Sequence, residues 1–287
     1  MAQQALNFEN RISAQFDGLS PKQRAVARLI LDNPYFASFA SAVEIGEKVD
    51  ASAATVVRLC QVLGYQGLPD LQETIRQDLP SYLTAAERFE QRSGTQSLNG
   101  ELPQRVFAND IANLRHTATV LDSPNFDRAV ALLADARRVL VIGSGVSGPP
   151  AQFLAYSLEV MGHSARAIVE GGLGLAVALS RLTADDVVVG ISFWRYTQAT
   201  VQALEQALML GTPAIAITDS IVSPLSREVD LAFEVATDGV AHSLSITALM
   251  SLLNAFIAGV ALHNPESTSL ALRQVDSQFK TLDLLTP

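Results

Sequence analysis

The chain has 287 residues, enough for one large or two ordinary domains, and its 48% hydrophobic content supports a buried core in each. Its formal net charge of -9 argues against a protein that coats nucleic acid or anionic membranes, so we expect any DNA contact on a small surface. The single cysteine, Cys60, excludes an internal disulfide and suits a reducing cytosol. Residues 1–10 lack the features of a secretion signal, which favours a cytoplasmic protein.

The N-terminal part of the chain has a helical pattern throughout. A helix is predicted to begin at Ser20-Pro21, and two shorter helices follow over residues 43–48 and 53–63. Ser52 is well placed as the N-cap of the last of these helices, which stops at Gly64. Two short helices joined by a turn of roughly three or four residues have the geometry of a helix-turn-helix.

The predicted helix 53–63 has a buried side and an open side. Helical spacing places four residues on the buried side: Val56, Leu59, Cys60 and Leu63. The open side carries the residues that we expect in a DNA major groove: Ser52, Ala54, Thr55, Arg58 and Gln61. Arg58 can reach guanine or phosphate, and Thr55 can bond a phosphate or touch a thymine methyl. The alternative is a helical bundle that contributes only packing.

Composition predicts three segments along the chain. Residues 92–100 are rich in Ser, Gly, Gln and Asn, and Pro103 follows, as in interdomain linkers. We therefore expect a helix-turn-helix domain over residues 1–80, a linker over residues 81–104 and a second domain over residues 105–287. Acids slightly outnumber basic residues in the first domain, so tight DNA binding would need a dimer and a focused face.

The second domain alternates strands with helices. Five apolar segments are predicted strands: residues 139–142, 165–169, 187–191, 214–218 and 231–235. Strand-helix repeats of this length predict a doubly wound parallel five-stranded sheet flanked by helices, with a ligand at the carboxyl ends of the strands. A last helix is predicted within residues 243–262, where Ser, Thr and Asn interrupt an uncharged stretch. These interruptions favour a core or dimer-interface helix over a membrane span.

Glycines and hydroxyls gather where the predicted strands end. The first strand runs into Gly143-Ser144-Gly145-Val146-Ser147-Gly148, where glycines allow a tight turn and a close approach to a ligand. The helix that opens at Pro149-Pro150 has a start that suits an anion. The ends of later strands add further hydroxyls: Ser192, Thr197, Thr218 and Ser220. Together they predict a phosphate or polyol pocket.

Four segments carry a resemblance to a known family. They are Ala54-Thr55-Val56-Val57-Arg58-Leu59-Cys60 running into Leu63-Gly64-Tyr65, Gly143-Ser144-Gly145-Val146-Ser147, Ile191-Ser192, and Ala216-Ile217-Thr218-Asp219-Ser220 followed by Ser223-Pro224-Leu225. Over nearly the full length the chain resembles the RpiR family of bacterial transcriptional regulators. The resemblance implies an N-terminal helix-turn-helix that binds double-stranded operator DNA and a C-terminal sugar isomerase (SIS) domain that senses a phosphosugar. We expect a homodimer or homotetramer without enzymatic activity.

One segment departs from the family pattern. After the third strand the SIS pattern is Ser-x-Ser-Gly-x-Thr, whereas this chain has Ser192-Phe193-Trp194-Arg195-Tyr196-Thr197. Trp194 can fill space that a sugar would occupy, and Arg195 can clamp a phosphate or carboxylate, which keeps an organic acid open as the ligand. Alternatively, Trp194 and Tyr196 pack under the loop or at a subunit interface. The expected ligand-binding residues are Gly143, Ser144, Gly145, Ser147, Ser192, Arg195 and Thr197.

Two alternative functions use the same pocket. Gly143-x-Gly145-x-x-Gly148 is a literal dinucleotide fingerprint, and Glu170 lies about where a ribose-binding acid belongs, so a nicotinamide-sensing repressor is one alternative, although dinucleotide binding does not require Ser192 and Thr197. A sugar-phosphate isomerase would need a base, for which Glu170 and His242 are candidates. The four histidines have no metal-ligand spacing and the sequence has no nucleophile elbow, so we expect no cofactor, no metal and no catalytic residue.

Overall fold

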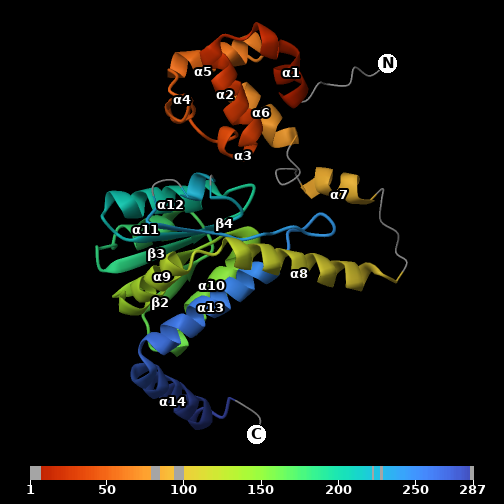
Figure 1. Cartoon of the computed structure of the whole chain (residues 1–287). Coiled ribbons are helices and arrows are strands. Elements are labelled where there is room, and N and C mark those ends of the chain that lie inside the picture. The colour runs from red at the N-terminus through yellow and green to blue at the C-terminus, as the bar shows by residue number, and fades with distance from the viewer. Residues whose placement is uncertain (1–7, 79–84, 94–99, 222, 227–228, 285–287) are drawn as a thin grey trace. The chain divides into compact units, whose positions relative to one another are not determined.

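The computed structural model describes residues 8–78, 85–93, 100–221, 223–226 and 229–284 (Figure 1). The chain divides into two units, Met1–Gln96 and Ser97–Pro287, which we name the helical unit and the sheet unit. The segment 81–104, predicted as a linker, includes helix α7 (Ala85–Ser93) and the first residues of α8 (Leu102–Val120). The predicted domain limits at residues 80 and 105 remain a proposal.

Short helices build the helical unit around one core. They are α1 (Phe8–Gln15), the 3-10 helix η1 (Phe16–Gly18), α2 (Pro21–Asp32), α3 (Pro34–Ala37), α4 (Ala42–Glu47), α5 (Ala53–Val62) and α6 (Leu68–Asp78). Helix α2 begins with a capping box, in which the side chains of Ser20 and Gln23 each accept the other's backbone N–H. Among the fully buried core residues are Ile12, Ile30, Ile45, Leu59 and Leu71. Helices α4 and α5 confirm the predicted helix-turn-helix.

The sheet unit alternates strands and helices after its first two helices. Its elements are α8, α9 (Ser123–Asp135), β1 (Arg138–Ile142), η3 (Gly145–Ser147), α10 (Gly148–Val160), β2 (Ala165–Ile168), α11 (Leu173–Leu179), β3 (Asp186–Ile191), α12 (Gln198–Met209), β4 (Ala214–Thr218), η4 (Pro224–Ser226), β5 (Leu231–Glu234), α13 (Thr247–His263) and α14 (Pro265–Thr281). All strand pairs are parallel, in the order β2-β1-β3-β4-β5. The predicted doubly wound five-stranded parallel sheet is confirmed.

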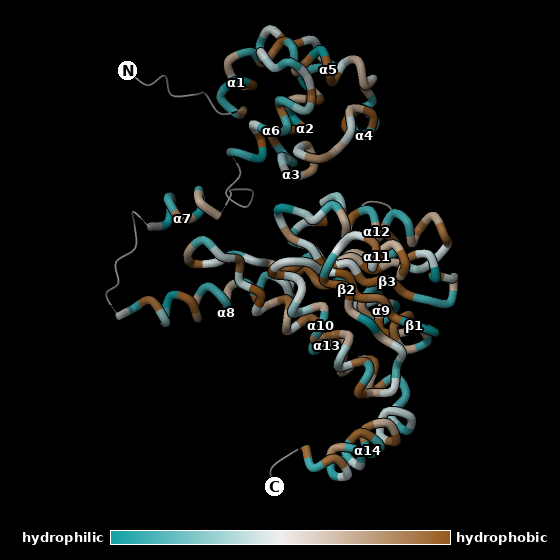
Figure 2. The backbone as a smooth tube through the Cα atoms, turned by 180° about the vertical axis from the view of Figure 1, so that it is seen from behind, coloured by the Kyte–Doolittle hydropathy of each residue, from teal (hydrophilic) through white to brown (hydrophobic). Residues whose placement is uncertain are grey.

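Helices cover both faces of this sheet. One face packs against α9, α10 and α13, and the other against α11 and α12 (Figure 1). The central strands β1 and β3 are buried on both faces, since Val139 and Val141 point to one core while Leu140 and Ile142 point to the other. Figure 2 shows these strands as hydrophobic backbone at the centre of the unit. This burial explains why continuous aliphatic runs in the sequence form strands.

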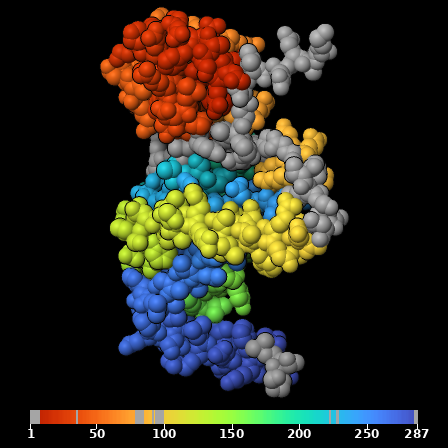
Figure 3. Space-filling model, turned by 45° about the vertical axis from the view of Figure 1, so that its right-hand side comes forward, coloured from red at the N-terminus to blue at the C-terminus, as the bar shows by residue number. Residues whose placement is uncertain are grey.

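The C-terminal segment forms two helices where the sequence predicts one. Helix α13 is a core helix that packs on α8, α9 and α10, with Leu249, Leu253 and Phe256 fully buried. Asn264 caps the second helix, α14, by accepting the backbone N–H of Ser267. Both helices belong to the blue, C-terminal part of the chain in Figure 3. No single described helix is long and apolar enough to cross a membrane; α13 and α14 meet that test by length and composition only as a pair, with a bend of 107° between them.

Candidate functional site

Close backbone packing shapes the turn between α4 and α5. A Cβ atom on Gly46 would lie 2.4 Å from the carbonyl oxygen of Ala51, so a side chain there would push the two helices apart. Asp50 has a positive φ of 49° in this turn, and its carboxylate accepts a hydrogen bond from Lys22 of α2 at 2.5 Å. This exposed ion pair links the turn to α2, and the buried core that α2 and α5 share holds α5 in the bundle.

Helix α5 buries the side that was predicted to be buried. Val56, Leu59 and Cys60 are fully buried, and Leu63 follows at the end of the helix. Burial raises the pKa of the Cys60 thiol to about 11, so the thiol stays neutral near pH 7. Because the thiolate is the reactive form, Cys60 acts as a core residue.

The opposite side of α5 presents the predicted DNA-contacting residues. Ser52, Ala54, Arg58 and Gln61 are exposed, and Thr55 is half-buried. Ser52 also caps the helix, because its Oγ accepts the backbone N–H of Thr55 at 3.2 Å. Its hydroxyl lies 2.9 Å from Thr55 Oγ1, so the two side chains form one polar pair at the start of α5.

Arg58 differs from several other cations of the helical unit. Four of these cations are engaged within the unit: Lys22 with Asp50, Arg11 over Tyr65, Arg28 over Phe16, and Lys48 over Phe36. For Arg58, no hydrogen bond, ion pair or ring contact is found within the described part of the chain. Its guanidinium is therefore available to an external anion or base edge.

The glycine loop after β1 is folded tightly on itself. A Cβ atom on Gly143 would lie 2.7 Å from the carbonyl oxygen of Ser147, so only glycine fits there, and Gly145 has a positive φ of 61°. Gly143 and Ser147 are buried, Ser144 is half-buried and Gly145 is exposed. Helix α10 begins at Gly148, so Pro149 and Pro150 occupy its next two positions and contribute no N–H. The start of α10 thus offers fewer free amides than other helix starts do.

The loop between β3 and α12 is held by its own side chains. The buried Ser192 accepts the backbone N–H of Thr197 at 3.0 Å, and Thr197 stands at the N-cap position of α12. Trp194 and Tyr196 are half-buried and meet edge to face, with ring centroids 5.9 Å apart. Arg195, which lies between them in the chain, is exposed.

Asp219 is a residue of this region to which the sequence analysis gave no role. Its carboxylate accepts the backbone N–H of Trp194 at 3.1 Å and the hydroxyl of Tyr196 at 2.9 Å. Burial raises the pKa of Asp219, and the hydrogen bonds that it accepts act in the opposite direction. An acid directly after a strand that ends in Thr218 was visible in the sequence, but its partners were not.

The strand order brings these loops to one edge of the sheet. They follow β1, β3 and β4, which are neighbours, and the carboxyl ends of parallel strands lie at the same edge. Helices α10 and α12 leave β1 and β3 toward opposite faces, so the point between these two strands is the topological switch point at which such folds bind ligands. The predicted ligand-binding residues flank that point on two loops.

The two side chains proposed as catalytic bases for an alternative function do not lie in a buried site. Glu170 and His242, considered above as catalytic bases, are both exposed. Within the described residues, no group of three or more His, Cys, Asp or Glu side chains could hold a metal ion.

Comparison with known proteins identifies both units. Residues 6–81 match the helix-turn-helix domain of the rpiR family, and residues 132–259 match the SIS domain. The sugar isomerase domain of an RpiR transcription factor from Sphaerobacter thermophilus is 39% identical, covers 62% of this chain and 99% of its own, and superposes with a TM-score of 0.60. The chain belongs to the RpiR family. This RpiR-family protein is a DNA-binding transcriptional regulator with a helix-turn-helix domain and an SIS domain.

Two further relatives match nearly the whole RpiR-family chain. The HTH-type transcriptional regulator HexR of Pseudomonas aeruginosa is 28% identical over 281 residues, and the match covers 94% of both proteins. The NanR protein of Vibrio vulnificus, solved as a complex with ManNAc-6P, covers 98% of this chain and all of its own at 23% identity and a TM-score of 0.69. NanR shows that the two-domain fold recurs in a second, distantly related protein.

Proposed function

We propose that this regulator binds operator DNA through α5 and that a small phosphorylated sugar at the carboxyl edge of its sheet changes its affinity for that DNA. The exposed Arg195, between Ser192 and Thr197 in the loop after β3, is the observation that carries the ligand assignment. A guanidinium in this loop can bind an anionic group with two parallel hydrogen bonds. The complex of NanR with ManNAc-6P supports a sugar phosphate over an organic acid.

The proposed DNA interface is the exposed side of α5. Its residues are Ser52, Ala54, Thr55, Arg58 and Gln61. The small side chain of Ala54 allows the helix to approach the floor of the major groove, and Arg58 supplies a cation for guanine or phosphate. The polar pair of Ser52 and Thr55 stands at the helix start, where backbone phosphate contacts are common.

The proposed effector site combines backbone and side-chain donors from two loops. Its residues are Gly143, Ser144, Gly145, Ser147, Ser192, Arg195 and Thr197. Since Pro149 and Pro150 remove two amides from the start of α10, hydroxyls and Arg195 must supply much of the anion binding. Ser192 supports the site indirectly, because its hydroxyl already holds Thr197.

We propose sensing without catalysis. Isomerisation needs a base beside the ligand, and the two candidates, Glu170 and His242, are exposed. A dinucleotide would need the start of α10 for its pyrophosphate, and two prolines reduce the donors there. Both features support a sugar phosphate effector over the two alternatives.

We further propose a homodimer, because an operator of two half-sites requires two copies of α5 about 34 Å apart. Helix α14 supplies a surface for this contact. Four of its residues and the C-cap residue after it recur at alternating spacings of four and three, the pattern of a helix-pairing seam: Thr268, Leu272, Val275, Phe279 and Leu282. Leu272 and Leu282 are 40% and 61% exposed, so the chain itself covers this seam only in part.

Two substitutions test the two proposed sites separately. Arg58→Ala should weaken binding to the promoter upstream of the gene at least about fivefold, since one arginine contact to a base is worth roughly 1–3 kcal/mol. It should leave the thermal stabilisation by sugar phosphates unchanged. Arg195→Ala should keep the DNA affinity and strongly reduce that stabilisation, because the charged anchor is lost while the hydroxyls and loop amides of the site remain.

Each of these variants is the control for the other. The measurements are fluorescence anisotropy with a promoter duplex at fixed salt and a thermal-shift series with sugar phosphates, organic acids and nicotinamide nucleotides. Loss of both activities in Arg58→Ala would mean that α5 has a structural role. An unchanged ligand response in Arg195→Ala would contradict the proposed effector site, and stabilisation by an organic acid or nucleotide alone would contradict the proposed ligand class.

A further inference from the structure

One carboxylate holds both chain neighbours of Arg195. Asp219 Oδ2 accepts the backbone N–H of Trp194 at 3.1 Å, and Asp219 Oδ1 accepts the phenol of Tyr196 at 2.9 Å. The hydroxyl of Thr218 lies 3.3 Å from the same Oδ1. The carboxylate thus connects the end of β4 to the loop after β3 on both sides of the arginine.

Among the described residues, the hydrogen-bond partners of Asp219 are neutral donors. Among the described residues no cation pairs with this carboxylate, although it lies in a desolvated place that raises its pKa. A buried carboxylate without a counter-charge costs stability unless several hydrogen bonds compensate it. An alanine or an apolar residue would avoid that cost, so stability alone does not explain an acid at this position.

The geometry of the loop between β3 and α12 indicates what the Asp219 carboxylate does there. Trp194 and Tyr196 are turned inward and half-buried, whereas Arg195 between them is exposed. Because both neighbours are fixed to one carboxylate, the loop cannot swing Arg195 to another position without breaking charge-assisted hydrogen bonds. In the SIS pattern a glycine at the position of Arg195 lets the backbone approach the ligand, whereas in this chain the long arginine side chain must reach it, so the direction of that side chain matters.

We propose that Asp219 is a positioning residue of the effector site, which fixes the loop between β3 and α12 so that the Arg195 guanidinium is presented to the anionic group of the ligand. This inference rests on the proposed function, in which Arg195 binds that group. Asp219 does not touch the ligand; it acts through Arg195. An isosteric asparagine should weaken the arrangement, because it removes the charge that strengthens both hydrogen bonds, and its Nδ2 only donates, so either the Trp194 amide or the Tyr196 hydroxyl loses its carboxylate acceptor.

A double-mutant cycle with inorganic phosphate tests the proposal. Trp194 is the single tryptophan of the chain, so its fluorescence reports phosphate binding to the intact protein at constant ionic strength. Asp219→Asn should raise the phosphate dissociation constant about fivefold in the wild-type background, the effect of one hydrogen bond. In the Arg195→Ala background the same substitution should have no further effect, because the group through which it acts is gone.

Two more variants separate positioning from general effects. Tyr196→Phe removes one donor and leaves the carboxylate, so it should weaken phosphate binding in the same direction and also lose this effect in the Arg195→Ala background. It carries the test if Asp219→Asn does not fold. Glu205→Gln removes an exposed carboxylate of α12 and should leave the dissociation constant unchanged.

The outcomes distinguish the inference from the function on which it rests. Equal losses from Asp219→Asn in both backgrounds, or no loss in either, would overturn the positioning role while Arg195 could still bind the anion. An unchanged phosphate affinity in Arg195→Ala alone would overturn the proposed effector site itself. A loss confined to the background that contains Arg195 supports both.

Discussion

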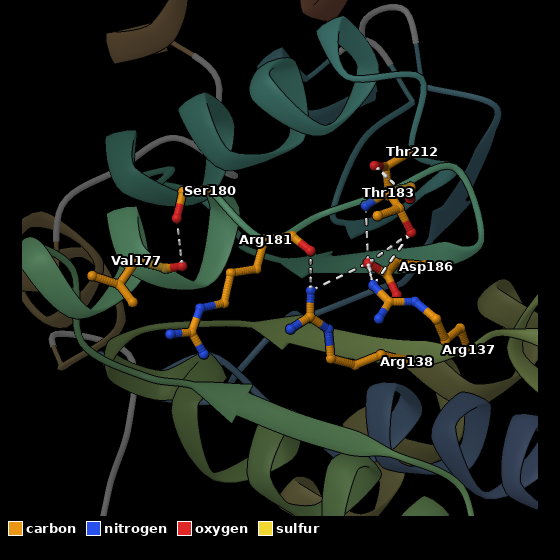
Figure 4. A network of polar contacts seen from close by, with 8 residues as sticks. All are labelled: Arg137, Arg138, Val177, Ser180, Arg181, Thr183, Asp186 and Thr212. Atoms are coloured by element: carbon orange, nitrogen blue, oxygen red, sulfur yellow. Dashed lines mark hydrogen bonds and ion pairs between the residues drawn. The ribbon is translucent and has the colours of Figure 1, made fainter.

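At the scale of single residues, a buried carboxylate also organises the opposite edge of the sheet. Asp186, fully buried at the start of β3, accepts hydrogen bonds from Arg137 at 2.7 Å, from Arg138 at 3.2 Å and from the backbone N–H of Thr183 at 3.0 Å (Figure 4). It thereby joins the start of β1 to the start of β3 and to the turn before it. Both arginines bond the same oxygen, Asp186 Oδ2, so this one carboxylate supplies the counter-charge for both of them.

Removal of this carboxylate should destabilise the sheet unit. We expect Asp186→Ala to lower its free energy of unfolding by about 3 kcal/mol, at the low end for a broken buried ion pair because water reaches Arg137. Urea unfolding followed by the fluorescence of Trp194, which lies in this unit, measures the loss. The adjacent Asp185 is exposed, so Asp185→Ala is the matched control and should change the stability little. Equal losses in the two variants would contradict the role of Asp186.

At the scale of elements, the sequence predicted what depends on local pattern. The observed ends of all five strands lie within one residue of the predicted ends. Each strand is an apolar run that is buried on one face or on both, so its limits can be read from the sequence pattern. The cap at Ser52 and the stop at Gly64 were likewise local signals. Helix α14 was missed because Asn264-Pro265 reads as a helix end as well as a helix start.

The part of the site that the sequence did not predict depends on contacts between distant segments. Asp219 meets residues that lie 23 and 25 positions earlier in the chain, across two neighbouring strands. No periodicity or cap signal encodes such a pairing, which follows from the strand order and the fold of two loops. The sequence did suggest that Trp194 and Tyr196 pack under their loop, and both are half-buried there.

Helix α14 provides a prediction at the element scale. If its seam pairs two copies of the chain, Leu272→Glu should place a charge in that contact and raise the dimer dissociation constant at least about tenfold. Gln274→Glu introduces the same charge at an exposed position of α14 outside the seam, and should leave the dimer intact. Sedimentation velocity over a range of concentrations distinguishes the two species. A dimer unaffected by Leu272→Glu would place the interface on another surface.

At the scale of the whole molecule, regulation requires that one chain carries two sites that influence each other. The family assigns DNA binding to the helical unit, and the proposed effector site lies in the sheet unit. An effector can alter DNA affinity only by binding one arrangement of the protein more tightly than another. The two affinities are therefore linked by a single coupling free energy, whichever direction the regulation takes.

This linkage gives a quantitative prediction. If a sugar phosphate changes the dissociation constant for the promoter duplex by some factor, a saturating duplex must change the dissociation constant for that sugar phosphate by the same factor. Fluorescence anisotropy of labelled DNA gives the first value, and the fluorescence of Trp194 gives the second in the same buffer. Arg58→Ala, which should bind the duplex more weakly, is the control: at a duplex concentration that saturates the wild type but not the variant, added DNA should change the sugar phosphate affinity of the variant less. Unequal factors would show that the ligand acts outside the DNA-binding equilibrium, for example on the assembly of the dimer, because a two-site linkage in one species permits only one coupling value.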